Sequence, residues 1–223
     1  MKFEVLERQL SYRFQRTVLL RQALTHRSFS ADHNERLEFL GDSILNMVVA
    51  LALYVRFDGL REGEMSRLRA QLVRQDTLQM IAERLDLGSC LSLGEGELKS
   101  GGHRRPSILA DALEAVFGAI YLDAGFEAVK RVIDGLYAEM LMSLDPARSL
   151  KDPKTALQEA LQARRLPLPK YEMTEERGEA HAREFEVHCV IERLNICTAG
   201  VGASRRIAEQ VAAAAALTQL EQA

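Results

Sequence analysis

The stretch Glu35-Arg-Leu-Glu38-Phe-Leu-Gly-Asp42-Ser-Ile-Leu-Asn46 combines acidic and apolar residues at helical spacing. Glu38 and Asp42 lie four positions apart, so on an α-helix their side chains share one face, one turn apart. Glu35 and Asn46 extend this polar stripe in both directions. The apolar side chains between them predict that the other faces of the helix are buried. They are Leu37, Phe39, Leu40, Ile44, Leu45 and Val48.

A second stretch, Ser107-Ile-Leu-Ala-Asp111-Ala-Leu-Glu114-Ala-Val-Phe-Gly118, repeats the arrangement. Asp111 and Glu114 are three positions apart, and they are the only charged residues between Arg105 and Asp123. A helix that is apolar on nearly every face is typical of a buried element. We therefore expect this helix in the core, with its two carboxylates on one side.

Carboxylates in apolar helices are costly unless they are paired or ligate a metal ion. If the two acidic stripes face each other, four carboxylates converge. Oxygen ligands without His or Cys favour Mg²⁺ or Mn²⁺ over Zn²⁺. Such a cluster suits phosphodiester hydrolysis, in which one ion activates a water and another stabilises the leaving oxygen. The alternative is a set of ion pairs with Arg36, Arg67, Arg69 or Arg74.

The first 140 or so residues show apolar positions at three- and four-residue spacing and no strand-like alternation, which predicts an all-α region. The helical pattern ends in the polar, proline-containing segment 145–152, whose composition is typical of a linker. Asp152 and Pro153 are a typical helix start. After a helix to about Arg165, three strands are expected at 170–176, 184–192 and, more weakly, 194–202, and then a helix that Ser204 caps. The predicted domains are an all-α unit, 1–144, the linker, 145–152, and an α-β-β-β-α unit, 153–223.

The bulk composition is that of an ordinary globular protein, with a net charge of −3. From Asp152 onward there are nine basic and eleven acidic side chains, a net charge of −2, so any attraction to phosphate must be local. The three cysteines form no metal or disulfide pattern and indicate a reducing compartment. We see no signal peptide and no uncharged run of about 18 apolar residues, so we expect a cytoplasmic protein that does not enter membranes.

Four segments resemble the ribonuclease III family, in its short bacterial form. Asn34-Glu-Arg-Leu-Glu-Phe-Leu-Gly-Asp-Ser-Ile-Leu45 is similar to the family signature, and Leu24-Thr-His-Arg-Ser28 to the segment before it. Leu98-Lys-Ser-Gly-Gly102 and Ile108-Leu-Ala-Asp-Ala-Leu-Glu-Ala115 are similar to its second acidic region. The likeness extends over essentially the whole chain.

The resemblance implies that Glu38, Asp111 and Glu114 ligate Mg²⁺, for which Mn²⁺ can substitute. Asp42 would be a catalytic acid that orients or activates the attacking water, a role that Glu114 would share. Glu35 would lie beside the ligands or contact RNA. For Asn46 the helix pattern, and not the resemblance, predicts a helix-packing hydrogen bond, with a place beside the ligands or RNA as the alternative. The resemblance also implies a homodimer with Phe39 packed across its interface, although the sequence pattern alone puts Phe39 in the core.

In the family, each site of the dimer cuts one strand of a duplex and leaves 5′-phosphate and 3′-hydroxyl ends with short 3′ overhangs. The implied substrates are double-stranded ribosomal and messenger RNA precursors and some transfer RNAs.

The C-terminal unit resembles a double-stranded RNA-binding domain, which reads duplex shape over about 16 base pairs. Gly200 and Gly202 precede the last helix, where we expect them to let backbone amides approach a phosphate. Ile207 and Glu209 stand where many such domains are more basic. The RNA-contacting residues that the resemblance implies are Gln158, Glu159, His181, Ser204, Arg205 and Arg206.

Two other functions remain open at this point. One is an RNA-binding protein with a vestigial nuclease site. The presence of all four carboxylates argues against it. The other is a helical metal phosphohydrolase for small nucleotides, which usually needs His-Asp ligand pairs. His33 follows Asp32 directly, but in an expected loop.

Overall fold

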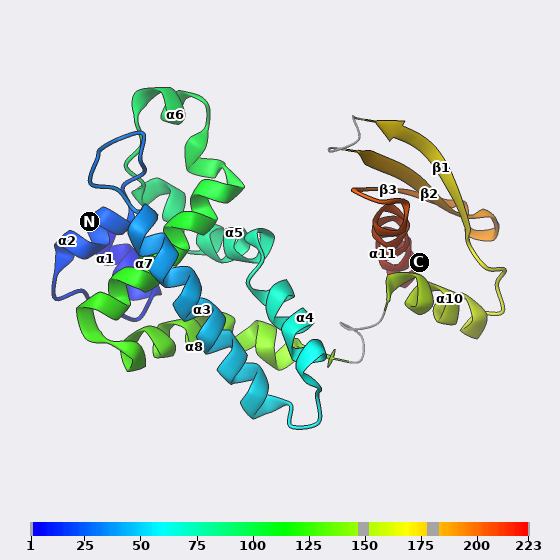
Figure 1. Ribbon diagram of the computed structural model, residues 1–223, viewed down its shortest axis with the longest axis horizontal. Helices are drawn as coiled ribbons and strands as arrows, with labels where there is room; N and C mark the ends of the chain where they lie inside the picture. Colours follow the sequence, from blue (N-terminus) through cyan, green and yellow to red (C-terminus); the bar gives the residue numbers. More distant parts are fainter. Residues whose placement is uncertain (1, 147–151, 178–182, 223) are drawn as a thin grey trace. The chain divides into compact units, whose positions relative to one another are not determined.

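The computed structural model describes residues 2–146, 152–177 and 183–222. The chain forms two compact units, Met1–Leu144 and Asp145–Ala223, and each is described by itself (Figure 1).

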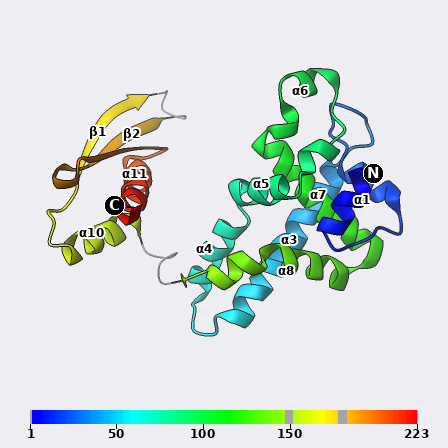
Figure 2. The same ribbon diagram turned by 180° about the vertical axis from the view of Figure 1, so that it is seen from behind.

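The regular secondary structure in the described residues of the N-terminal unit is helical, apart from one isolated bridge between Thr25 and Ser92. Helix α7 lies at its centre, with the long helices α3 and α8 and the shorter α2 and α5 packed against it (Figures 1 and 2). The α-helices are α1 (Lys2–Gln9), α2 (Thr17–Ala23), α3 (Glu35–Arg56), α4 (Glu62–Leu72), α5 (Gln75–Arg84), α6 (Glu95–Lys99), α7 (Pro106–Ala124) and α8 (Phe126–Ser143). Short 3₁₀ turns occupy η1 (Leu87–Cys90) and η2 (Gly102–Arg104).

Helices α3 and α7 make the most extensive contact between helices in this unit. Their backbones touch at two glycines, Gly41 on α3 and Gly118 on α7. A Cβ atom at Gly118 would lie 2.3 Å from the backbone oxygen of Leu37 and 3.3 Å from the nitrogen of Gly41. Only residues without a side chain permit this approach, so the crossing point fixes which faces of the two helices meet.

The buried face of α3 agrees largely with its sequence pattern, because Leu37, Ile44, Leu45 and Val48 are buried. Phe39 is an exception. Its side chain is 78% exposed, so the expectation that it belongs to the core of the chain is wrong. Apolar residues in this turn of α3 point to more than one face of the helix, and α7 and the neighbouring helices bury only some of them.

Further apolar residues of α3 are exposed toward its C-terminal end, including Met47, Tyr54 and Val55. By length and composition α3 is one helix of the described chain that could cross a membrane, a test that core helices of soluble proteins also pass. Because it packs on α7 through Gly41 and its buried side chains, we treat it as a core helix.

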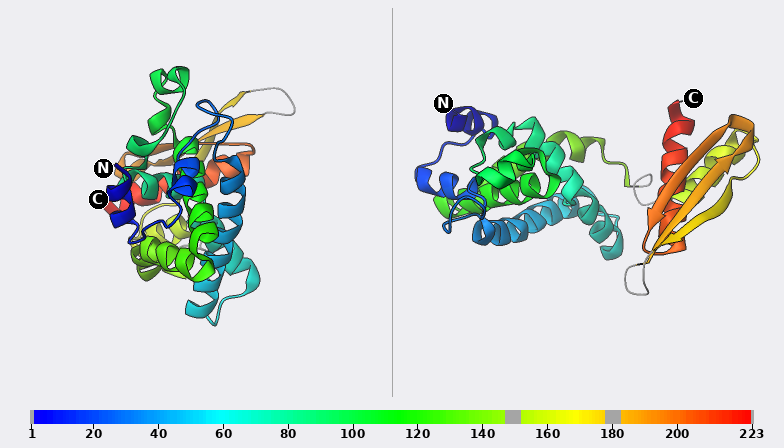
Figure 3. Two further views of the ribbon diagram at one scale, coloured as in Figure 1. Left: turned by 90° about the vertical axis from the view of Figure 1, so that its left-hand side faces the viewer. Right: turned by 90° about the horizontal axis from the view of Figure 1, so that it is seen from above.

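The C-terminal unit has the order α10 (Pro153–Ala163), β1 (Lys170–Arg177), β2 (Glu184–Ile191), β3 (Ile196–Gly202) and α11 (Arg205–Gln222), with a 3₁₀ turn, η3 (Glu192–Leu194). The antiparallel sheet has the order β1-β2-β3. Both helices lie on one face of it (Figure 3). Their core contains Leu157, Leu161, Cys189, Ile191, Ile196, Ala212, Ala213, Ala216 and Leu220. The helical unit and the α-β-β-β-α unit confirm the predicted fold class.

Both helix starts in this unit follow from their capping residues. The Asp152 carboxylate accepts a hydrogen bond from the backbone nitrogen of Thr155 at 3.2 Å, and the Ser204 hydroxyl accepts one from that of Ile207 at 3.3 Å. The carboxylate and hydroxyl thus satisfy backbone donors that the first turn of a helix leaves free.

The glycines of β3 lie directly against α11. A Cβ atom at Gly200 would lie 2.3 Å from the backbone oxygen of Ala208 and from the nitrogen of Ala212, and one at Gly202 would lie 2.5 Å from Cγ2 of Ile207. They therefore let β3 pack closely on α11, and the approach of their backbone amides to a phosphate stays a prediction. Small inward-facing residues such as Gly200 and Thr198 also explain why β3 has a weak strand pattern.

Candidate active site

Three carboxylates from two helices meet at the α3–α7 crossing. Glu38, Asp111 and Glu114 each offer an oxygen, and these three oxygens lie within 4.8 Å of one another. Glu38 stands one turn before Gly41 on α3, and Glu114 supplies the backbone oxygen that faces Gly41. The close helix contact therefore brings the acidic stripes together, as the sequence pattern predicts.

Burial and crowding with like charges favour the neutral form of Glu114. Burial, followed by the charges of Asp42, Asp111 and Glu38, raises the pKa of Glu114 to about 8. Without a cation this carboxyl group holds a proton at neutral pH. Such a perturbed group beside other acids is typical of a functional site.

The other two carboxyl groups are shifted in the same direction. Burial and then the charges of Asp111 and Glu35 raise the pKa of Glu38, and Arg27 partly opposes them. Burial also raises the pKa of Asp111, against the influence of His26 and Arg27. The positive groups nearby, Arg27 and His26, do not bring the pKa values of Glu38 and Asp111 back to their ordinary values. The cluster is therefore short of positive charge.

The alternative of structural ion pairs is excluded within the described part of the chain. No arginine there forms an ion pair with Glu38, Asp42, Asp111 or Glu114, and Arg74 pairs with Asp76 at 3.8 Å. The arginines proposed as partners, Arg36, Arg67, Arg69 and Arg74, therefore leave the carboxylate cluster uncompensated.

Asp42 lies beside the cluster and is held by Asn46. The Asn46 side-chain nitrogen donates to Oδ1 of Asp42 at 2.8 Å and to its backbone oxygen at 3.0 Å. Asp42 is more exposed than the three clustered carboxylates. Asn46 thus orients one oxygen of Asp42 and leaves the other available to solvent or substrate.

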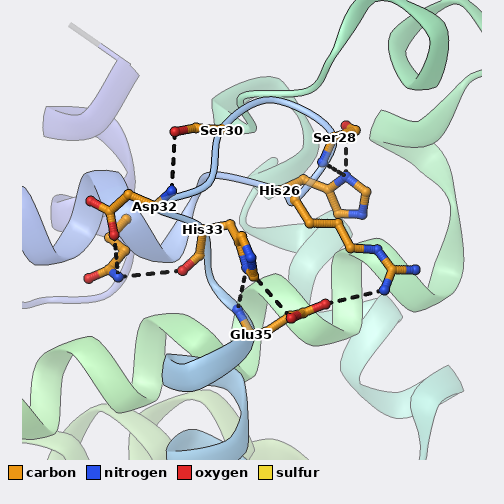
Figure 4. A network of polar contacts seen from close by, with 8 residues as sticks. His26, Ser28, Ser30, Asp32, His33 and Glu35 are labelled. Carbon is orange, nitrogen blue, oxygen red and sulfur yellow. Dashed lines mark hydrogen bonds and ion pairs between the residues drawn. The ribbon is translucent and has the colours of Figure 1, made fainter.

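Glu35 is held by the loop before α3 and not by the cluster. It accepts a hydrogen bond from Arg27 at 3.2 Å and lies 3.8 Å from Nδ1 of His33. Figure 4 shows His33 turned toward Glu35, with His26 and Ser28 in the same loop. The loop itself is attached to the rest of the unit, because Oγ of Ser28 accepts a hydrogen bond from the backbone of Gly94 at 3.0 Å.

A cavity of about 600 Å³ extends from Glu38 and Asp111 along this loop. Its cationic side chains, Arg27 and Arg105, and the imidazole of His26 were not identified as functional from the sequence. The matching segments Leu24–Ser28 and Leu98–Gly102 were the available signal, but neither has a spacing that indicates a particular chemistry. The cavity is also lined by Ser28, Asn34, Glu35, Glu97, Ser107 and Ile108.

The cluster has the donors and the spacing of a small divalent cation site. All three donors are carboxylate oxygens, which hard cations such as Mg²⁺ prefer. At Mg–O distances of about 2.1 Å, oxygens on opposite sides of the ion would be about 4.2 Å apart. A limit of 4.8 Å between the oxygens is therefore close to what such an ion needs.

In the C-terminal unit, the expected RNA contacts fall on two helices. Gln158 and Glu159 lie on α10, and Ser204, Arg205 and Arg206 lie at the start of α11. The start of α10 is joined to α11 by Lys154, whose Nζ lies 2.7 Å from Glu209. His181 lies outside the described residues.

Two family models match the chain. A ribonuclease-III-like model covers residues 16–141 and a double-stranded RNA binding motif covers residues 153–220. The chain is 64% identical over 219 residues to ribonuclease 3 of Aromatoleum aromaticum, covering 98% of this chain and 97% of that one. It is 58% identical over 216 residues to ribonuclease 3 of Thiobacillus denitrificans, covering 97% and 96% of the two chains.

Solved structures agree with the N-terminal fold. The nuclease domain of ribonuclease III from Campylobacter jejuni, in a structure concerned with a region involved in dimer formation, matches with a TM-score of 0.60 and 46% identity. It covers 61% of this chain and 96% of that one. A second structure of the same nuclease domain gives a TM-score of 0.61 at 45% identity, covering 64% and 97% of the chains. A helical nuclease domain followed by a double-stranded RNA-binding domain, with close relatives over nearly its full length, places this chain in the ribonuclease III family.

Proposed function

We propose that this protein is a Mg²⁺-dependent endoribonuclease that hydrolyses double-stranded RNA and leaves 5′-phosphate and 3′-hydroxyl ends with short 3′ overhangs. The observation that carries the proposal is the convergence of Glu38, Asp111 and Glu114 within 4.8 Å. The expected substrates are ribosomal RNA precursors, some messenger RNAs and transfer RNAs, and the expected compartment is the cytoplasm.

Glu38, Asp111 and Glu114 would hold the cation, and Mn²⁺ can replace Mg²⁺ because both prefer oxygen ligands. A bound divalent cation supplies charge stabilisation at the phosphate and lowers the pKa of water. Asp42 is the residue that we assign to orienting the attacking water, because its carboxylate adjoins the cluster and is fixed by Asn46 at 2.8 Å. We assign Glu114 to the same role as a carboxylate, because it would release its proton to solvent when the cation binds.

The cavity beside the cluster has two arginines that a substrate phosphate could contact. Arg27 and Arg105 line it together with Glu38 and Asp111. Each is paired in the free chain, Arg27 with Glu35 at 3.2 Å and Arg105 with Glu97 at 2.7 Å, so a phosphate beside the bound cation would compete with these carboxylates. Glu35 restrains Arg27 there through the hydrogen bond of 3.2 Å, which supports its assignment beside the ligands.

We further propose a homodimer that buries the exposed apolar side of α3. Phe39, Met47, Tyr54 and Val55 are exposed in the single chain. A groove of about 460 Å³ lies next to them, lined in part by Met47, Tyr54 and Met65. Exposed apolar surface of this kind is typical of an interface, and a dimer places two sites on opposite strands of one duplex. Sedimentation of the wild-type protein and of Phe39→Glu tests this proposal, which a wild-type monomer at micromolar concentration would contradict.

Cleavage of a long RNA duplex, with and without EDTA, tests the proposed activity. We expect cleavage only with Mg²⁺ or Mn²⁺, and we expect Asp42→Asn and Glu114→Gln to bind duplex without cutting it. Binding by the wild-type protein without cleavage would indicate a vestigial site. Faster hydrolysis of free nucleotides than of duplex would favour a small-molecule phosphohydrolase.

A further inference from the structure

One carboxylate in the C-terminal unit is bound by two cations on the helices that carry the expected RNA contacts. Glu209, in the second turn of α11, accepts hydrogen bonds from Nζ of Lys154 at 2.7 Å and from Nε of Arg205 at 2.9 Å. Its side chain is only 14% exposed. A carboxylate that is nearly covered and has two charged donors is held firmly in one position.

Lys154 is turned inward by this arrangement. It comes from the first turn of α10, its side chain is 29% exposed, and its Nζ lies 4.4 Å from the ring centroid of Tyr171 on β1. The ammonium group is therefore enclosed between a carboxylate and an aromatic face. A phosphate that approached Lys154 would have to displace both partners.

Arg205 is restrained in part. Its Nε is engaged by Glu209 one turn along α11, while its side chain remains 60% exposed. The guanidinium can still present its outer nitrogens to solvent. Arg205 therefore stays near the start of α11, with part of its charge offset by the neighbouring carboxylate.

Glu209, Lys154 and Arg205 together carry a net charge of +1, whereas Lys154 and Arg205 alone would carry +2. Glu209 stays ionised, because the hydrogen bond from Lys154 outweighs burial and, with that from Arg205, lowers its pKa. Nonspecific affinity for nucleic acid depends mainly on how many phosphates the basic residues neutralise. The unit is already net negative, so one carboxylate beside the few basic residues of α10 and α11 has a large relative effect.

We propose that Glu209 is a specificity-determining residue, which withholds Lys154 and part of Arg205 from phosphate and so limits nonspecific electrostatic binding. This inference rests on the proposed function, in which the C-terminal unit binds duplex RNA. It assigns the shape-dependent part of binding to the remaining contacts of α10 and α11. It also assigns Lys154 to the interior of the domain and not to the RNA surface.

Binding of the full-length protein to a short RNA duplex and to the same duplex in DNA, in EDTA and over a range of salt concentrations, tests the proposal. We expect Glu209→Gln to bind RNA about three- to tenfold tighter near 0.1 M salt, with the slope of log K against log salt steeper by about one. DNA affinity should rise at least as much, so the preference for RNA should fall.

Glu192→Gln is the matched control. It removes one carboxylate from the same unit and releases Lys170, with which Glu192 forms an ion pair at 2.5 Å. The strand register places this ion pair at one end of the sheet, because Lys170 lies opposite Val190, whereas Arg177 lies opposite Glu184 at the other end. The pair is therefore remote from the 177–184 connection, which contains the expected RNA contact His181. We expect its RNA affinity to stay within about twofold of the wild type and its salt slope to be unchanged.

An unchanged or weaker affinity of folded Glu209→Gln, or the same gain in Glu192→Gln, would overturn the proposal. Should Glu209→Gln fail to fold, Lys154→Gln tests the same claim. If Lys154 is withheld from phosphate, its loss leaves the salt slope unchanged, whereas a slope reduced by about one would overturn the proposal. A wild-type protein that binds no duplex would overturn the proposed function, and this inference with it.

Discussion

A Cβ atom at Gly41 would lie 1.8 Å from the backbone oxygen of Glu114. The residue that permits the helix crossing and a residue of the acidic cluster are therefore in direct contact. Gly41→Ala must separate α3 from α7, and overpacking of this kind costs about 2–4 kcal/mol of stability. Because the same movement separates Glu38 from Glu114, we also expect most of the cleavage activity to be lost.

Thermal unfolding and duplex cleavage measure both effects. Gly63→Ala is the control, because nothing lies within 4 Å of a Cβ atom there and Gly63 is in the first turn of α4. It should leave stability unchanged or slightly raised. A fully active and stable Gly41→Ala protein would show that the crossing tolerates a wider spacing.

The raised pKa of Glu114 predicts how stability without metal depends on pH. Since its pKa is about 8 in the folded chain and 4.5 is its ordinary value, the folded state binds a proton that the unfolded state has released. This contribution is complete below pH 4.5 and is lost as the pH rises to 8. In EDTA, the wild type should lose about 1–2 kcal/mol between pH 6 and pH 9, allowing for solvent screening.

Glu114→Gln has no such proton to lose, so its unfolding free energy should vary less over the same range. Urea titrations of both proteins at several pH values measure the difference. Parallel pH profiles for the two proteins would contradict the raised pKa.

The hydrogen bond from Asn46 to Asp42 predicts a catalytic effect without a change in fold. Asn46→Ala leaves the Asp42 carboxylate free to rotate, and loss of such an orienting contact typically lowers activity by about 10- to 100-fold. We expect the loss in kcat at saturating Mg²⁺, with little change in RNA affinity. Ser43→Ala, which removes only a 3.3 Å hydrogen bond to the backbone of Phe39 on the same helix, should cleave at the wild-type rate. Equal cleavage rates for the wild type, Asn46→Ala and Ser43→Ala would show that Asn46 has no role in the mechanism.

Asp123 is expected to fasten the N-terminal segment to the end of α7. Its side chain is 0% exposed and accepts hydrogen bonds from the Tyr12 hydroxyl at 2.7 Å and the backbone nitrogens of Gln15 and Arg16 at 2.8 and 2.9 Å. Burial alone would raise its pKa, but these donors lower it below the ordinary 3.8. Its stabilising effect is therefore present above pH 3.8 and is lost as the pH falls through the folded-state pKa.

Asp123→Asn should lower the free energy of unfolding by about 2–3 kcal/mol at neutral pH, and the deficit should shrink in acid. Asp134→Asn breaks a more exposed helical ion pair with Lys130 and should cost under about 0.5 kcal/mol. Chemical denaturation at pH 7 and pH 3 compares them. A deficit for Asp123→Asn no larger than that of Asp134→Asn would show that the carboxylate is not needed.

The acidic cluster could be predicted from the sequence because helical spacing determines which side chains share a face. Glu38 and Asp111 each lie at a fixed spacing from a second carboxylate, and the apolar residues around them indicate burial. That the two helices meet at this level could not be predicted by spacing alone. It depends on the contact of Gly41 with the backbone of α7, which is a property of two distant segments.

Other features were predicted wrongly or missed because a local pattern does not determine how distant segments pack. An apolar residue such as Phe39 satisfies a core pattern and an interface pattern equally, and only its exposure in the folded chain excludes the core. The glycine spacing before α11 gave no sign of the close contact between Gly200 and α11, which depends on how β3 packs on that helix. Arg27 lines the cavity from a loop, where no periodicity indicates the direction of a side chain.

We propose that Glu38, Asp111 and Glu114 hold a divalent cation between α3 and α7. Anomalous diffraction from crystals of the protein grown with Mn²⁺ would locate this ion. We expect a strong anomalous peak within about 2.0–2.3 Å of an oxygen from each of the three carboxylates. Crystals at the same Mn²⁺ concentration with no peak there, or with an arginine side chain between the carboxylates, would contradict it.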